Sequence, residues 1–222
     1  MSMKDSNNSK PLDIIMLGRS GSGKGTQAKL LVDRLGLEYI GTGDLLREFS
    51  HRENAAAGHL KQALTQGKLV PSWLAFFVWM EKLAYVQPQK GVLFDGSPRK
   101  LPEAQVLDEV LEWYERFNVK VVLIDISREE ARKRLLHRKV CSQCGKGAYI
   151  IDDSNKCKHC GGVLNIRMED NPQAIETRLD WFDSEVLPVV EYYRVKGNLV
   201  MVNGERSTEE ISQDLLNKLE LV

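Results

Sequence analysis

One stretch of the sequence constrains the fold more than any other. A short apolar run, DIIML (13–17), leads into the glycine-rich GRSGSGKGT (18–26), and helical spacing follows at 27–36. In this order, a strand, a glycine loop and a helix direct several backbone N–H groups at one point, and the helix N-terminus adds partial positive charge. Lys24 is placed to reach the outer phosphates of a nucleotide. An ordinary tight turn would need the glycines only for their backbone angles, so the combination favours a phosphate-binding loop.

Strands and helices alternate along the rest of the chain. Apolar runs predict strands at 37–40, 91–96, 119–126 and 198–204, and helical spacing predicts helices at 55–66, 72–86, 102–116, 128–139 and 169–197. This alternation predicts an α/β fold with a parallel sheet and right-handed crossovers. Ligands of such sheets bind at the carboxyl ends of the strands, where the glycine loop, Asp95 and Asn203 fall.

Local signals suggest where several helices begin and where one bends. Thr42 or Ser50 is expected to cap the short helices that follow the second strand. Pro188 is expected to kink the long helix 169–197, and Ser207 with Glu210 resembles a capping box for the last helix.

The charge balance limits the classes of partner. The chain has 222 residues, and its 31 Lys+Arg cancel its 31 Asp+Glu, so we expect no wholesale binding to nucleic acid or to an anionic membrane. No apolar run approaches the ~18 residues of a membrane span, and the N-terminus lacks an apolar signal core. Residues 1–11 are polar and are expected to be disordered. The sequence therefore predicts a cytoplasmic protein.

The residue after the loop lysine departs from the general pattern. Gly25 follows Lys24, and Thr26 comes one later, so the loop reads G-x-x-G-x-G-K-G-T. In this form it resembles adenylate kinases and related nucleoside monophosphate kinases, and the resemblance extends from about residue 13 to 221. It implies a P-loop three-layer fold with a parallel β-sheet core, an inserted helical region that binds the monophosphate, and a small zinc-bearing lid. The implied division is a core at 12–40, 73–138 and 168–222, a monophosphate-binding region at 41–72 and a lid at 139–167.

Five further segments carry the resemblance: GTGDLLR (41–47), GKLVP (67–71), DGSPR (95–99), RLLHR (134–138) and RMEDNPQAIETR (167–178). The resemblance implies that ATP contacts Gly21, Ser22, Gly23, Lys24, Gly25, Thr26, Arg134 and Arg138. It implies that AMP contacts Thr42, Arg47, Leu69, Val70, Gly96, Arg99, Glu103, Arg167 and Arg178.

The chemistry accounts for so many arginines. Two polyphosphates repel each other, and phosphoryl transfer needs alignment and stabilisation of charge rather than covalent help. Guanidinium groups supply both with bidentate geometry. The catalytic set implied is Lys24, Arg99, Arg134, Arg138, Arg167 and Arg178, with Asp95 anchoring the waters of an ATP-bound Mg²⁺. Asp95 could instead be a turn or capping residue, and each arginine alone could be a solvated surface charge.

Three positions depart from the family. Adenylate kinases usually have D-G-F-P-R-T-x-x-Q, in which the Gln reads adenine, whereas this chain has DGSPRKLPE and places Glu103 there. An ionised carboxylate only accepts hydrogen bonds, which would suit guanine better than adenine. Alternatively, Glu103 faces solvent or pairs with Lys100, and the GKLVP backbone selects the base. Arg19 and Ser97 are the other two departures, and Arg19 could be an additional contact to phosphate or to the lid.

Four cysteines have the spacing C-x2-C-x12-C-x2-C at Cys141, Cys144, Cys157 and Cys160. Two Cys-x-x-Cys-Gly turns can aim backbone N–H groups at the thiolates and complete a four-sulfur site suited to structural Zn²⁺, with iron as the main rival. Thiols or disulfides without metal are the remaining alternative. His159 is expected to be exposed rather than a ligand. A lid this small would owe its folding to the metal.

The leading function is a monomeric ATP:AMP phosphotransferase that uses Mg²⁺ and interconverts ATP plus AMP with two ADP. A second candidate keeps the chemistry but takes GMP or a pyrimidine monophosphate as acceptor. A third is a non-catalytic nucleotide-binding protein whose cysteine ribbon binds nucleic acid. The lid has Lys139, Lys146, Lys156 and Lys158 but Tyr149 as its one aromatic residue, which favours a solvated lid over a base-stacking platform.

Overall fold

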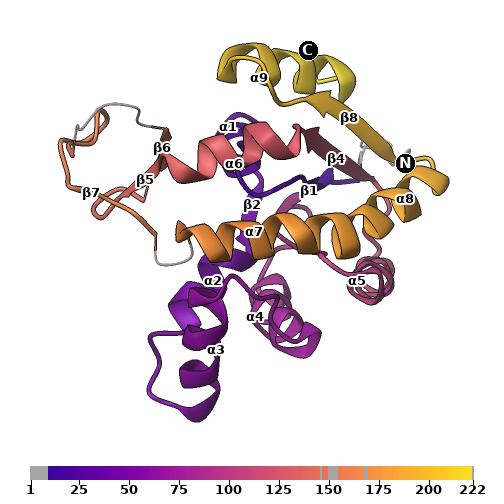
Figure 1. Cartoon of the computed structure of the whole chain (residues 1–222). Helices are drawn as coiled ribbons and strands as arrows, with labels where there is room; N and C mark the ends of the chain where they lie inside the picture. Colours follow the sequence, from indigo (N-terminus) through magenta and orange to yellow (C-terminus); the bar gives the residue numbers. More distant parts are fainter. Residues whose placement is uncertain (1–9, 146, 150–154, 168–169, 222) are drawn as a thin grey trace, which may run out of the picture.

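The computed structural model describes residues 10–145, 147–149, 155–167 and 170–221, so most of the expected N-terminal tail lies outside it. Its centre is a five-stranded sheet in the order β2-β3-β1-β4-β8, and every neighbouring pair is parallel (Figure 1). The strands are β1 (Asp13–Leu17), β2 (Glu38–Gly41), β3 (Val92–Asp95), β4 (Val119–Asp125) and β8 (Leu199–Asn203). The predicted α/β fold is confirmed.

Helices cover both faces of this sheet. One face packs on α1 (Lys24–Leu35) and α9 (Thr208–Lys218), and the other on α4 (Ser72–Ala84), α5 (Leu101–Trp113) and α8 (Leu187–Val195). Every residue of β1 is buried because it lies in the middle of the sheet with helices on both sides. The register pairs Met16 with Asp95, so the phosphate loop after β1 and the turn after β3 emerge side by side.

Two helices extend away from the sheet, below it in Figure 1. They are α2 (Thr42–Phe49) and α3 (Ala55–Thr65), which share a separate apolar cluster with α4. The predicted caps were wrong: Gly41 precedes α2, so Thr42 is its first helical residue. The cap of α3 is Asn54, whose side chain accepts a hydrogen bond from Ala57 N at 2.8 Å. Ser50 does not cap this helix because it lies in the turn directly after α2, before α3 begins.

The small second sheet contains the cysteines. It is antiparallel, in the order β6-β5-β7, from β5 (Arg138–Cys141), β6 (Gly147–Tyr149) and β7 (Leu164–Asn165). Residues 146 and 150–154 of the predicted lid lie outside the described residues. The preceding helix, α6 (Arg128–Leu136), ends earlier than predicted, because the backbone from Arg138 onward pairs with the neighbouring strands instead.

The helix predicted at 169–197 is interrupted. It begins as α7 (Pro172–Trp181), continues through one π-helical segment, η2 (Phe182–Val186), and resumes as α8. The expected kink at Pro188 is therefore replaced by a π-turn before it. Pro188 lies in the first turn of α8, where its missing N–H is tolerated. The capping box of Ser207 and Glu210 at α9 is confirmed.

In the described part of the chain, no helix is both long and apolar enough to cross a membrane. The division into core, monophosphate-binding region and lid stays a prediction. The separate apolar clusters of the α2–α4 region and of the cysteines agree with it, although the first of them includes α4 residues beyond residue 72.

Candidate active site

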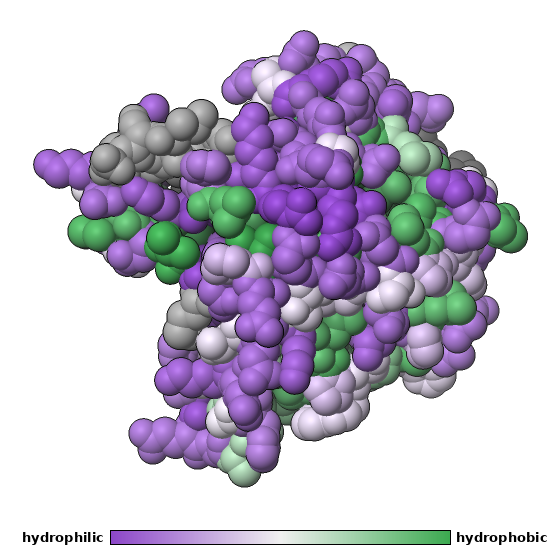
Figure 2. All heavy atoms as spheres, viewed as in Figure 1, coloured by the Kyte–Doolittle hydropathy of each residue, from purple (hydrophilic) through white to green (hydrophobic). Residues whose placement is uncertain are grey.

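A cleft of about 1030 Å³ opens at the carboxyl ends of β1 and β3. Its walls include residues of the phosphate loop, of α2, of α7 and of the lid. Figure 2 shows the lid and the α2–α3 region projecting on either side of a recess in the molecular surface. The cleft brings together all six arginines that the sequence singled out: Arg47, Arg99, Arg134, Arg138, Arg167 and Arg178.

The phosphate loop forms the floor of the cleft. Gly23, immediately before α1, has a φ of 86°, a left-handed conformation that glycine adopts at no steric cost. A Cβ on Gly25 would lie 3.2 Å from the Asp95 carboxylate, so a side chain directly after Lys24 would press on that acid. Gly21 to Thr26 all line the cleft, as predicted for a phosphate-binding loop.

Lys24 extends along this loop. Its ammonium donates a hydrogen bond of 3.3 Å to the carbonyl of Arg19. Protein atoms surround it although part of its surface faces the cleft, and this burial lowers the pKa of Lys24 to about 8. The Asp95 carboxylate opposes the shift, whereas the guanidinium of Arg99 adds to it. One carboxylate and three guanidinium groups, those of Arg99, Arg138 and Arg178, therefore act on this ammonium.

Asp170 organises two of the arginines. Its side chain is fully buried, and it accepts hydrogen bonds from Arg138 Nε at 2.7 Å and from Arg178 Nη1 at 2.7 Å. Sequence reasoning did not single out Asp170. An acidic residue between the paired arginines of segment 167–178 was the available signal, but the acid pairs with Arg138 only in the folded chain.

Arg99 is held by contacts of its own. Its Nε donates to Gly96 O at 2.6 Å, and its guanidinium carbon lies 5.5 Å from the centre of the Trp181 ring. Burial lowers its pKa, opposed by the Glu103 and Asp95 carboxylates. Arg47 lies on α2 and pairs with Asp44 at 2.6 Å. These contacts fix where each guanidinium points before any phosphate arrives.

Asp95 has one satisfied and one unsatisfied oxygen. Its Oδ2 accepts from the Tyr39 hydroxyl at 3.0 Å, whereas Oδ1 is buried and makes no hydrogen bond to the described residues. A buried acceptor without a partner is costly, so this oxygen fits the waters of a cation bound to phosphate. Tyr39 was not foreseen. Burial, together with the Asp95 and Asp44 carboxylates, raises the pKa of Tyr39, which keeps its hydroxyl a hydrogen-bond donor.

Four residues predicted to contact AMP do not line the described cleft: Thr42, Leu69, Val70 and Glu103. Gly67 and Lys68 of the GKLVP segment do line it, and Val70 packs in the α2–α4 cluster. The hydroxyl of Thr42 is buried without a hydrogen-bond partner among the described residues. The contacts of these residues with a base stay predictions.

Glu103 is 3% exposed, so the alternative that it faces solvent is wrong. Its Oε1 accepts from the Ser72 hydroxyl at 2.9 Å and its Oε2 from Arg99 N at 2.8 Å. Within the described part of the chain its hydrogen bonds go to these groups and not to Lys100. As the third residue of α5 it folds back on the turn that carries Arg99.

The four cysteine sulfurs lie within 4.8 Å of one another. Cys141 Sγ is 3.5 Å from Cys160 Sγ, and Cys144 Sγ is 3.7 Å from Cys157 Sγ. A tetrahedron with Zn–S bonds of about 2.3 Å requires S···S distances near 3.8 Å, so the set fits a structural zinc. Backbone N–H groups of Cys144 and Gln143 lower the pKa of Cys141 to about 6, which favours the thiolate.

The turns that hold the sulfurs have the predicted geometry. Gly145 and Gly161 have φ values of 65° and 75°, and their N–H groups close the two turns on Cys141 O and Cys157 O at 3.0 and 2.8 Å. His159 is exposed, as predicted, and is not part of the cluster. The four-cysteine cluster is confirmed, and it is compatible with zinc.

Comparison with known proteins agrees with the geometry. A sequence model of the family described as Adenylate kinase matches residues 16–198. The chain belongs to the adenylate kinase family. An adenylate kinase of Methanocella arvoryzae is 35% identical over 208 residues, which cover 92% of this chain and 96% of that protein. Those of Geobacter sp. (strain M21) and Archaeoglobus fulgidus are 35% and 33% identical, over 92% and 95% of this chain and 98% and 99% of their own lengths.

Membership of the adenylate kinase family makes this chain a phosphotransferase of the nucleoside monophosphate kinase class. The family binds ATP, AMP and ADP and uses Mg²⁺ with ATP. The positive cleft is the part of the structure where such ligands fit. Besides the predicted residues, Tyr39, Trp181 and Arg206 line it, and no local motif pointed to them. Asp170 contributes indirectly, through its hydrogen bonds to Arg138 and Arg178.

Proposed function

We propose that the chain catalyses reversible phosphoryl transfer from MgATP to AMP, giving two ADP. The observation that carries the proposal is the convergence of Lys24 and the six arginines on one cleft in a chain with no net charge. Two phosphorylated substrates need a concentration of positive charge of this kind, because their own charges oppose their approach.

The ATP side of the cleft is the phosphate loop. Backbone N–H groups of Gly21 to Thr26 bind the phosphates, with Lys24 on the outer ones and Arg134 and Arg138 beside them. Mg²⁺, when bound with ATP, neutralises phosphate charge and orients the transferring group. The Asp95 carboxylate, with one oxygen that has no partner among the described residues, would hold waters of that ion.

The AMP side is formed by Arg47 and Arg99, which line the same cleft. In this proposal Arg167 and Arg178 stabilise the charge of the transferring phosphoryl group. The acceptor oxygen of AMP is already ionised near neutral pH, so the reaction needs no general base. Thr42, Leu69, Val70, Gly96 and Glu103 complete the nucleoside pocket in this proposal.

The acceptor base is the one point where a second candidate is favoured by an observation. Glu103 is a buried carboxylate, which accepts hydrogen bonds and suits the two donors on the guanine edge. Its oxygens, however, already accept from Ser72 and from Arg99 N, which reduces its capacity for a base. We therefore propose AMP as the acceptor and GMP as the alternative.

The lid is proposed to bind one Zn²⁺ through Cys141, Cys144, Cys157 and Cys160. A metal would supply the folding energy that a lid with so small an apolar cluster lacks. Closure of a rigid lid would exclude water, which competes as phosphoryl acceptor. We further propose that the protein is a monomer, since one chain supplies the whole cleft. We also propose that it is cytoplasmic.

The test is a coupled assay of ADP formation with ATP as donor and AMP, GMP, CMP and UMP as acceptors, side by side. AMP should be used best, with a turnover that requires Mg²⁺. A preference for GMP would show that GMP, rather than AMP, is the acceptor. Absence of transfer to any of the four would refute the proposed function.

A further inference from the structure

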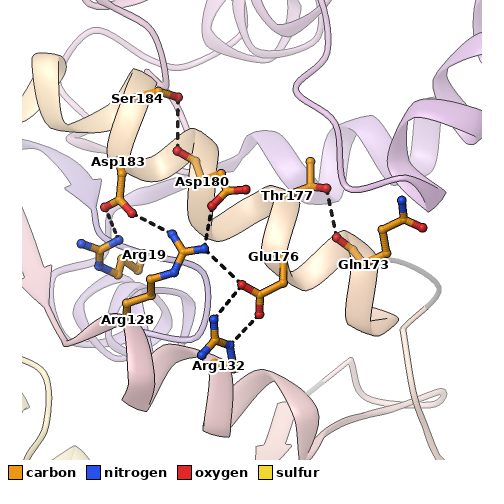
Figure 3. Close-up of polar contacts among 9 residues, drawn as sticks. All are labelled: Arg19, Arg128, Arg132, Gln173, Glu176, Thr177, Asp180, Asp183 and Ser184. Atoms are coloured by element: carbon orange, nitrogen blue, oxygen red, sulfur yellow. Dashed lines mark hydrogen bonds and ion pairs between the residues drawn. The ribbon is translucent and has the colours of Figure 1, made fainter.

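Arg19 lies in the phosphate loop, yet its side chain points away from the cleft. Its Nη1 lies 2.5 Å from Asp183 Oδ1 (Figure 3). Its Nε donates to Ile126 O at 3.2 Å. Its guanidinium carbon lies 4.3 Å from the centre of the Phe182 ring. The side chain is 14% exposed. These contacts rule out a phosphate contact in the described structure and tie the loop to η2.

The backbone of the same residue faces the other way. The carbonyl of Arg19 accepts a hydrogen bond from Ser22 N at 3.1 Å, which closes the glycine turn. It also accepts from the Lys24 ammonium at 3.3 Å. One residue therefore connects the catalytic lysine to the π-helical segment that follows α7.

Asp183 is itself part of a larger network. Figure 3 shows Arg128 of α6 between Asp183, Asp180 and Glu176, with distances of 2.9, 2.6 and 3.1 Å. These carboxylates follow one another at spacings of four and three residues, so they share one helix face. The position of Asp183 therefore follows that of α7, which also carries Arg178.

We propose that Arg19 is a positioning residue, which holds its own carbonyl, and through it the Lys24 ammonium, in register with α7 by means of the Arg19–Asp183 ion pair. This rests on the proposed function, in which Lys24 contacts the transferring phosphates. The competing explanation is an ion pair that stabilises the fold alone. Because the Asp183 side chain is 38% exposed, the contribution of this ion pair to stability would be small.

The two explanations differ in their effect on the titration of Lys24. The charged groups that face Lys24 are Asp95, Arg99, Arg138 and Arg178. Removing the cation of Arg19 without moving the loop would raise the pKa of Lys24, if it changed it at all. Loss of the carbonyl that accepts from the ammonium would lower it, because a hydrogen bond to the charged form favours that form.

The experiment compares wild type, Arg19→Ala, Arg19→Lys, Asp183→Asn and the double variant Arg19→Ala/Asp183→Asn. Arg194→Ala, which removes an exposed ion pair with Glu191 on α8, is the control. For each, kcat, KM for ATP, the alkaline limb of kcat/KM for ATP and the melting temperature are measured. Circular dichroism identifies variants that do not fold, and Asp183→Asn, which keeps the side-chain shape, is the second test if Arg19→Ala is one of them.

Arg19→Ala should lose about tenfold in kcat, the scale expected when a catalytic group is displaced slightly. The alkaline limb of its kcat/KM for ATP should move to lower pH. Arg19→Lys should recover part of kcat. The kcat of the double variant should be no more than about twofold below that of Arg19→Ala. Arg194→Ala should match wild type.

Arg19→Ala with kcat within twofold of wild type, or with its alkaline limb moved to higher pH, would overturn the inference. Additive losses of kcat in the double variant would overturn it as well. These outcomes presuppose an active wild type. An inactive wild type refutes the proposed function instead, so the two failures are distinguishable.

Discussion

The buried carboxylate of Asp170 binds Arg138 through both of its oxygens, with Nε–Oδ2 at 2.7 Å. The Arg138 side chain is 19% exposed, and Arg178, on the same carboxylate, is 14% exposed. Two guanidinium groups this close would repel each other without the acid. Asp170 therefore holds the two guanidinium groups close together at the cleft.

Asp170→Asn should destabilise the protein while keeping its shape. Removing one partner of a buried pair costs about 3–5 kcal/mol, and partial exposure of the arginines favours the lower end. We expect the melting temperature to fall by roughly 6 °C or more. Saturating ADP should restore part of that loss, because its phosphates neutralise the same arginines.

Calorimetric unfolding with and without ADP checks this, with Glu191→Gln as the control for an exposed carboxylate. A melting temperature equal to that of the wild type would contradict the role of Asp170.

Lys24→Ala and Arg99→Ala should each lose at least ~100-fold in turnover, because both remove charge that stabilises the transferring phosphoryl group. Steady-state assays of ADP formation measure the loss, and circular dichroism should remain that of the wild type. Lys61→Ala, an exposed substitution on α3, is the control. A well-folded Lys24→Ala or Arg99→Ala with near-wild-type turnover would disprove the role of that residue.

The rate should depend on the protonation of Lys24. Burial lowers its pKa to about 8 in the free protein, so kcat/KM for ATP should fall above about pH 8. Bound phosphate favours the ammonium, and the alkaline limb of kcat should therefore lie at higher pH. Lys24→Arg, which stays charged, should lower the rate but flatten the profile. An unchanged limb in Lys24→Arg would assign it to another group.

The same shift affects stability with a definite sign. The pKa of Lys24 is about 8 in the folded state and 10.5 as its ordinary value, so the unfolded chain binds more protons between these limits. Stability should therefore contain a contribution that rises with pH from about 8 to 10.5. Denaturant unfolding at several pH values should show this slope in wild type and lose it in Lys24→Met.

Metal-replete protein should contain one zinc per chain. Removing it with a chelator should lower the melting temperature and loosen the lid, while the parallel sheet stays folded. Elemental analysis and circular dichroism test both statements. Cys160→Ser should reduce the zinc content, and His159→Ala, on an exposed residue of the same turn, should not. An iron chromophore in freshly isolated protein would reject zinc in favour of the rival metal.

Glu103→Gln should use AMP as well as the wild type does, or better. A glutamine can accept from Arg99 N and donate to the Ser72 hydroxyl, so both hydrogen bonds of Glu103 have replacements. The assay compares AMP and GMP for both proteins, with Glu112→Gln on the exposed side of α5 as the control. A collapse of AMP use in Glu103→Gln would show that the carboxylate itself is required.

Local features were predictable because their causes lie within a few residues. The glycine loop, the individual strands, the two cysteine turns and the capping box of Ser207 all depend on neighbours in the chain. The predicted caps at Thr42 and Ser50 were wrong because the helices begin at other residues than expected. Helix α2 begins directly after Gly41, and α3 begins directly after Asn54, whose side chain caps it.

The class of site could be inferred from the chain alone, because a loop lysine and arginines at the family's spacing indicate phosphate binding in a chain without net charge. Which partner each charged side chain takes depends on the three-dimensional fold. Asp170 meets Arg138 across 32 positions, and Arg19 meets Asp183 across 164. Such pairs depend on how the crossovers bring distant elements together. The sequence alone does not distinguish a charged side chain that contacts phosphate from one that pairs with another helix.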